Sequence, residues 1–141
     1  MEELYYTPKI EDLFIGYRCE ILDFDDFGNH IYKLYEIRFE YDWLEIPERF
    51  NERLRTKYLD KEDIQSQEWI YNSRSIDIWF EKEGEFEMGS WTAYKAKLQY
   101  GLHDKRLRIF VIDTDETEYD CFRGICKSIN EFKKIIEWTF Q

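Results

Sequence analysis

The side chains that could do acid–base chemistry in this chain are two histidines among 31 carboxylates. His103 precedes Asp104, and a histidine beside a carboxylate can act as a general base. Both His30 and His103 fall in expected turns, and the sequence offers no obvious nucleophile and no Gly-rich phosphate loop. Close carboxylate pairs are inevitable at this abundance and indicate no glycoside chemistry by themselves. We therefore expect surface histidines and no enzyme.

One acidic turn partly matches a calcium-binding loop. Asp23, Asp25 and Gly28 occupy positions one, three and six of that pattern, but the twelfth position is Leu34, where a bidentate Glu is needed. A second acidic turn, residues 113–117, lacks the glycine. We interpret both as polar hairpin ends and, with no zinc spacing present, expect no metal and no cofactor.

The three cysteines, Cys19, Cys121 and Cys126, have no C-x-x-C spacing and cannot all pair within one chain. All three lie in strand-like runs, which predicts reduced core thiols. The start of the chain has no basic region followed by an apolar run, and no segment has the apolar length of a membrane span. We expect a cytoplasmic protein.

Two charged clusters could bind a partner. The first is an acidic face, and its candidate residues are Asp23, Asp25, Asp26, Glu36, Glu40 and Asp42. Alternate strand residues lie roughly 6.6–6.8 Å apart, close to the roughly 7 Å between two phosphates of one nucleic-acid strand. The face could therefore mimic nucleic acid toward a basic protein. The alternative is the solvated side of an edge hairpin, where charges commonly protect the edge from aggregation.

The second cluster is a basic island, which comprises Arg49, Arg53, Arg55, Lys57 and Lys61. With Tyr58 and Trp69 nearby it could hold RNA by charge and stacking. The alternative is a solvated face paired with neighbouring acids. Trp79 falls on the polar side of its expected strand and is a candidate contact residue, unless a second layer buries it.

The charge of the chain favours a protein partner over a nucleic acid or a membrane. The net charge is −11, and residues 1–47 hold 12 acids against 4 bases, a net of −8. Such a field repels nucleic acid and favours a basic partner, although solubility alone would also account for it. Hydrophobic residues make up 43% of the chain and aromatics 19%, which excludes disorder and favours strands.

The periodicity of apolar residues predicts the strands and helices that position these side chains. Alternation over residues 13–23 and 33–43 predicts a hairpin with one core face and one wet face, joined by a turn at Gly28-Asn29. Residues 48–55 fit either a short helix or an irregular crossover. A short strand at residues 54–58 and a helical turn over residues 61–67, capped by Asp60, come next.

The second half of the chain predicts more strands and a helix. The expected strands are residues 75–82, 91–100, 106–113 and 118–126. A turn around Gly84 is expected to follow the first of them. Ser128 and Glu131 form an S-x-x-E capping box before a helical apolar pattern. We predict an α+β fold of about six to seven antiparallel strands, with a short mid-chain helix and a C-terminal helix on the sheet, in a single domain over residues 1–141.

Three segments resemble small uncharacterised phage and prophage proteins, notably of gut Bacteroidota. The segments are Lys57–Gln65 (KYLDKEDIQ), Cys121–Ile135 (CFRGICKSINEFKKI) and Tyr6–Tyr17 (YTPKIEDLFIGY). The chain departs from the group at Gln67-Glu68, where a Leu-Gly helix stop is usual, and at residues 44–52. The resemblance implies a phage or mobile-element origin and a host-cytoplasm setting, with no catalytic residues to transfer.

We therefore expect a phage-type accessory protein that binds another protein, as an acidic inhibitor of a host defence complex in the manner of anti-CRISPR proteins. The expected partner is a basic, nucleic-acid-binding protein, and the oligomeric state is open. A minor virion or assembly protein is the first alternative. An RNA-binding module that uses Arg53, Arg55 and Lys57 is the second.

Overall fold

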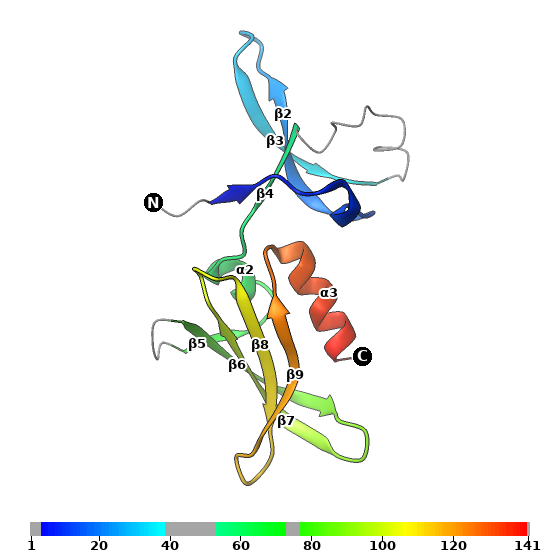
Figure 1. The fold of residues 1–141 in the computed structure, drawn as a ribbon, viewed down its shortest axis with the longest axis vertical. Helices are drawn as coiled ribbons and strands as arrows, with labels where there is room; N and C mark the ends of the chain where they lie inside the picture. Colours follow the sequence, from blue (N-terminus) through cyan, green and yellow to red (C-terminus); the bar gives the residue numbers. More distant parts are fainter. Residues whose placement is uncertain (1–3, 39–52, 73–76, 141) are drawn as a thin grey trace. The chain divides into compact units, whose positions relative to one another are not determined.

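The computed structural model describes residues 4–38, 53–72 and 77–140. Within them the chain has nine antiparallel strands in two sheets, a short mid-chain helix and a C-terminal helix (Figure 1). The α+β class is as predicted, but there are two sheets and more strands than expected. The chain divides into two compact units, residues 1–58 and 59–141, so the single domain stays a prediction. No described helix is long and apolar enough to cross a bilayer.

The first unit is a four-stranded sheet with the order β1-β4-β2-β3. Its strands are β1 (Tyr5–Tyr6), β2 (Arg18–Phe24), β3 (His30–Glu36) and β4 (Leu54–Lys57), and a 3-10 turn spans Ile10–Asp12. One side of the sheet packs a small core of Leu13, Tyr17, Cys19, Ile37 and Leu54. This side is called the core side below.

The expected hairpin is present, with different bounds. β2 begins at Arg18 because the chain turns at Gly16, whose φ of +93° is a conformation that glycine adopts without strain. β3 begins at His30, and the expected strand beyond residue 38 lies outside the described residues. Leu54 opens β4, so the question of helix or crossover now concerns mainly residues 48–52, which are also outside them.

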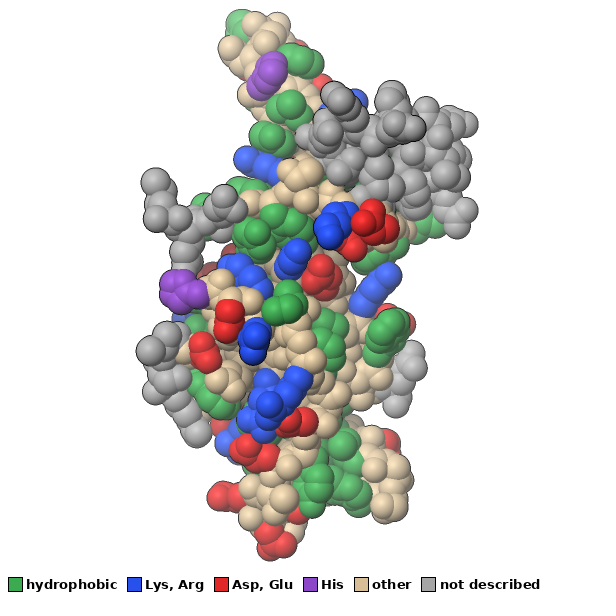
Figure 2. Space-filling view, viewed as in Figure 1, with side chains coloured by type: hydrophobic (Ala, Val, Ile, Leu, Met, Phe, Trp, Pro, Cys, Tyr) green, Lys and Arg blue, Asp and Glu red, His purple; other side chains and the backbone are tan. Residues whose placement is uncertain are grey.

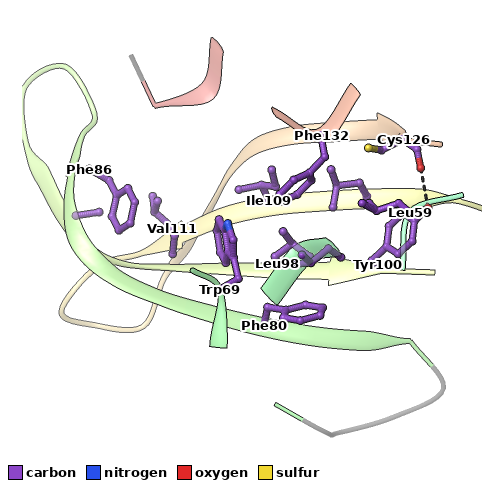
Figure 3. Packing of buried hydrophobic residues seen from close by; sticks show 14 residues of the cluster. Leu59, Trp69, Phe80, Phe86, Leu98, Tyr100, Ile109, Val111, Cys126 and Phe132 are labelled. Carbon is purple, nitrogen blue, oxygen red and sulfur yellow. Dashed lines mark hydrogen bonds between the residues drawn. The ribbon is translucent and has the colours of Figure 1, made fainter. Parts of the chain in front are cut away.

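The second unit is a five-stranded meander with helices on one face. Its strands, in sheet order, are β5 (Ile70–Asn72), β6 (Ile78–Glu87), β7 (Thr92–Tyr100), β8 (Arg106–Ile112) and β9 (Glu118–Ile125). The helices are α2 (Lys61–Gln65) and α3 (Ile129–Thr139). Buried residues of strands and helices interlock in one core, where the Tyr100 hydroxyl donates to the Cys126 carbonyl at 2.7 Å (Figure 3).

The predicted turn at Gly84 is wrong. β6 continues through Gly84 to Glu87, with a register irregularity between Glu83 and Phe86, and the chain reverses near Gly89, whose φ is +86°. Glycine inside a strand often marks such an irregularity. Alternation along residues 91–100 predicts Tyr94 on the buried side with Ala96, Leu98 and Tyr100, and this is also wrong, because β7 buries Ala93 instead and leaves Tyr94 64% exposed.

Both predicted helix caps are present. Asp60 accepts a hydrogen bond from the Asp63 backbone N–H, and the Asp63 side chain accepts one from the Asp60 N–H. Ser128 likewise accepts from the Glu131 N–H. The Glu131 carboxylate, however, accepts from the Lys127 N–H at 2.6 Å, one residue before the position expected for a capping box.

Candidate protein-binding surface

The side of the first sheet opposite its core carries large exposed apolar residues. Side chains alternate along a strand, so residues two apart share a side. We call this side the hairpin face, and its residues are Tyr5, Arg18, Glu20, Leu22, Phe24, His30, Tyr32, Leu34, Glu36, Arg55 and Lys57. Figure 2 shows hydrophobic side chains reaching the surface along the β2–β3 hairpin.

Arg55 organises the hairpin face. Its guanidinium carbon lies 3.9 Å from the ring centroid of Tyr5 and 3.7 Å from that of Tyr32. The same group is 2.7 Å from the Glu20 carboxylate, on the neighbouring strand β2. Four strands therefore contribute to this tyrosine–arginine cluster, whose guanidinium charge is balanced by Glu20. Tyrosine and arginine are among the residue types that most often dominate binding energy at protein interfaces.

The apolar part of the face extends from this cluster to the hairpin end. Leu34 is 92% exposed, Phe24 56% and Tyr32 42%. The Phe24 ring meets the His30 ring edge-on, with 4.8 Å between centroids. Scattered exposed hydrophobic residues are ordinary, but several neighbours on one sheet face form a patch, and patches mark interaction sites.

The expected acidic face is divided between the two sides of the hairpin. Asp23 lies opposite Ile31 and Glu36 opposite Arg18, so Asp23 points to the core side and Glu36 to the hairpin face. Each has a cation beside it: Lys33 Nζ is 3.3 Å from Asp23, and Arg18 Nε is 3.4 Å from Glu36. The backbone N–H of Phe24, with help from Lys33, lowers the pKa of Asp23.

The other predicted acidic residues have separate roles or places. Asp25 accepts from the backbone N–H groups of Phe27 and Asn29, and the Asn29 bond is the largest of the causes that lower its pKa. It therefore ties the turn together, as expected for a polar hairpin end. Asp26 is exposed in the same turn. Glu40 and Asp42 lie outside the described residues.

The basic island does not form a single group of cations available for RNA. Arg53 donates to the Leu22 carbonyl at 3.2 Å, and Arg55 is held by Glu20. Lys57 is exposed on the hairpin face, while Lys61 belongs to the other unit, where it stacks on a tyrosine ring. Arg49 falls outside the described residues. RNA binding stays a prediction.

Trp79 lies on the side of the five-stranded sheet away from the helices. It is half-buried, and its ring meets the buried Phe110 ring edge-on, with 6.4 Å between the ring centroids. The guanidinium of Arg108 covers Phe110 from 4.0 Å. The partial burial of Trp79 thus involves side chains of its own sheet, and its role as a contact residue stays a prediction.

The same sheet face has a concavity of about 470 Å³ near its β7–β8 turn. Its charged and polar lining residues are Asp77, Gln99, Asp104, Arg106, Arg108 and Arg123. Most of this charge is compensated locally. Arg108 pairs with Asp120 at 2.7 Å and with Glu118 at 3.0 Å, and Arg123 also pairs with Asp120. In the ranges that the structure describes, no three His, Cys, Asp or Glu side chains group as metal ligands would.

The cysteines are free thiols; Cys19 lies in β2 and Cys121 in β9, whereas Cys126 follows the end of β9. Cys19 and Cys126 are buried, and Cys121 is half-buried. Burial raises the pKa of the Cys19 thiol to about 12 and also raises the pKa values of Cys121 and Cys126. Thiols in this state are poor nucleophiles at neutral pH.

Sequence reasoning missed Tyr5, Phe24, Tyr32 and Leu34 as surface residues. A signal was available, because β3 has apolar residues on both alternating sets: Ile31 and Tyr35 on one, Tyr32 and Leu34 on the other. A hairpin with one buried side and one solvent-exposed polar side would not have apolar residues such as Tyr32 and Leu34 on its exposed side. Tyr5 gave no such signal, since β1 has only two residues.

No protein-family model matches the chain. No curated protein and no solved structure matches it either.

Proposed function

We propose that this protein acts by binding another protein through the hairpin face, without catalysing a reaction. The observation that carries the proposal is the exposed apolar group of Phe24, Tyr32 and Leu34 around the Tyr5–Arg55–Tyr32 stack. Rigid aromatic residues lose little conformational entropy on binding, and an arginine already balanced by Glu20 needs no new counter-ion. Such a surface suits a partner that covers it with apolar side chains.

The proposal includes a biological setting. The resemblance of residues 57–65 and 121–135 to phage proteins supports a phage-type accessory protein in the host cytoplasm. Binding and blocking a host defence complex, in the manner of anti-CRISPR proteins, is the corresponding role. The net charge of −11 favours a basic, nucleic-acid-binding partner, because the field of the whole protein steers the two together.

Binding can be tested with matched variants on the two units. A partner is first captured from host lysate and identified by mass spectrometry, and its affinity is then measured with purified proteins. Phe24→Ser and Leu34→Ser should each weaken binding at least about tenfold, as expected for truncated interface anchors. Tyr94→Ser and Trp138→Ser remove exposed aromatics of the other unit and should leave the affinity unchanged. Equal loss in both pairs would contradict the proposed surface.

Salt separates the apolar version of the proposal from an acidic one. If the hairpin face makes the contacts, affinity should fall only modestly with salt, while the association rate should slow because steering is screened. If carboxylates make the contacts, affinity should fall steeply, and charge reversal at Glu36, Glu40 and Asp42 should abolish binding. We expect the modest fall in affinity, since Asp23 and Glu36 are each paired with a cation of the same chain, Lys33 and Arg18 respectively.

A further inference from the structure

Among residues 4–38, 53–72 and 77–140, β3 pairs only with β2, so its outer edge has no partner strand in that part of the chain. The Ile37 N–H donates to the Tyr17 carbonyl, and the Asp25 N–H to the Asn29 carbonyl, at the two ends of the hairpin. Hydrogen-bonded pairs alternate in an antiparallel ladder, so Ile31, Lys33 and Tyr35 bond to β2. The backbone groups of His30, Tyr32, Leu34 and Glu36 therefore point away from the sheet.

We propose that this edge pairs with β3 of a second copy of the chain, antiparallel, with Lys33 opposite Lys33. This register places Tyr32 opposite Leu34 of the second copy and His30 opposite its Glu36. All of these residues have outward backbone groups, so each such pair exchanges two N–H···O bonds. A two-fold axis through the Lys33 pair relates the copies and gives a closed dimer.

The side chains of β3 complement one another in this register. On the hairpin face, Tyr32 meets Leu34, and the imidazole of His30 meets the carboxylate of Glu36. On the core side, Ile31 meets Tyr35. Such cross-strand apolar and polar pairs stabilise a sheet.

The repulsion between the two opposed Lys33 side chains is offset by nearby carboxylates. Each Lys33 Nζ lies 3.3 Å from the Asp23 carboxylate of its own β2 strand. Like charges directly opposite each other destabilise a ladder, but here two cations and two anions form a neutral group of four. Lysine on an edge strand usually prevents pairing, and Asp23 offsets that effect here.

The dimer extends the proposed function without depending on it. Directly opposite residues share a side of a sheet, so both hairpin faces lie on one side of a continuous eight-stranded sheet. The pairing uses the backbone groups of the strand edge and sideways contacts between β3 side chains, whereas the proposed partner covers the hairpin face itself. One can therefore fail while the other stands.

A cysteine scan along β3 tests the register. Lys33→Cys places two thiols opposite each other in a non-hydrogen-bonded pair, where Cα atoms are about 4.5 Å apart, within the range of a disulfide. Under mild oxidation this variant should form a covalent dimer on a non-reducing gel, while the wild type, Tyr32→Cys, Leu34→Cys and Tyr94→Cys should not. Failure of Lys33→Cys to cross-link overturns the proposal, and preferential cross-linking of Tyr32→Cys or Leu34→Cys overturns its register.

Sedimentation of uncross-linked protein tests the pairing itself. The wild type should dissociate reversibly on dilution. Leu34→Pro removes an outward N–H that β2 does not use, so the hairpin should fold while the dimer Kd rises on the order of tenfold or more. Leu34→Thr keeps the N–H and should stay within a few-fold of the wild type. A wild type that is monomeric at every concentration overturns the proposal, as does an unchanged Kd in a folded Leu34→Pro variant.

Discussion

Arg55 is the residue that ties the hairpin face together. It contacts two tyrosine rings and one carboxylate from three other strands, and it is about one-third exposed. Lysine could keep the charge but not the planar stacking or the forked donor geometry. The residue type, and not only its charge, is therefore important for the arrangement of the face.

Arg55→Lys should consequently destabilise the first unit by about 1 kcal/mol, from lost stacking on two rings. Urea unfolding followed by circular dichroism measures the change. Lys57→Arg is the matched control, because Lys57 is exposed on the same strand and its replacement should stay within about 0.5 kcal/mol. A change at Arg55 no larger than at Lys57 would contradict the role assigned to the stack.

Asp25 gives a second prediction for a single residue, which concerns stability at acidic pH. Backbone N–H bonds, that of Asn29 first, hold its pKa below the unfolded value of about 3.9. A lowered folded pKa stabilises the fold above the unfolded pKa, and this contribution disappears as the pH falls through the folded pKa. An NMR titration should therefore place the Asp25 midpoint below about 3.9.

Asp25→Asn keeps one acceptor oxygen but cannot titrate. Its stability should change less than that of the wild type between about pH 5 and pH 3. Asp113 is a natural comparison, because Thr117 and Asp115 N–H groups lower its pKa in the β8–β9 turn. An Asp25 midpoint at or above the unfolded value would show that the turn bonds are not formed in solution.

At the scale of elements, the helix caps have the clearest energetic consequence. Asp60 and Asp63 satisfy each other's backbone N–H at the start of α2, a helix of only five residues. Without its cap such a short helix has little to hold its first turn. Asp60→Ala should cost about 1 kcal/mol, whereas Asp60→Asn, a good cap itself, should cost clearly less. Thermal unfolding of the two variants compares these costs, and equal losses would contradict the capping role.

Elements with local signals were predictable from the sequence. The capping residues of α2 and α3 and the two-sided apolar run of β8 all stand in contiguous segments, and each element formed as expected. β1 and β5 have two and three residues, too few for a periodicity to show. β6 passes Gly84 because pairing with β7 outweighs the local turn preference of glycine.

The candidate site was mostly not predictable, for a related reason. Tyr5, Tyr32 and Arg55 are far apart in the chain, and only the strand order brings them together. Charge pattern placed Asp23 and Glu36 on one acidic face, but the observed register puts them on opposite sides. Such contacts depend on nonlocal pairing, which alternation along one strand does not specify.

At the scale of the whole molecule, the two units differ in the size of the core that their described residues form. Among those residues, the second unit buries a cluster of 14 hydrophobic side chains, against 5 in the first. Hydrogen exchange should therefore be slower for core amides of the second unit, such as Leu98 and Ile109, than for Cys19 and Ile37. Equal opening free energies would indicate one cooperative unit and support the single domain predicted from the sequence.

The central claim is that the hairpin face contacts a protein partner. A photo-crosslinking phenylalanine analogue at position 24, compared with the same analogue at position 94, tests it most directly in host cells. We predict an adduct from position 24 that joins the chain to a different protein, and none from position 94. Adducts from position 94 alone, or from neither position in cells that contain the captured partner, would contradict the claim.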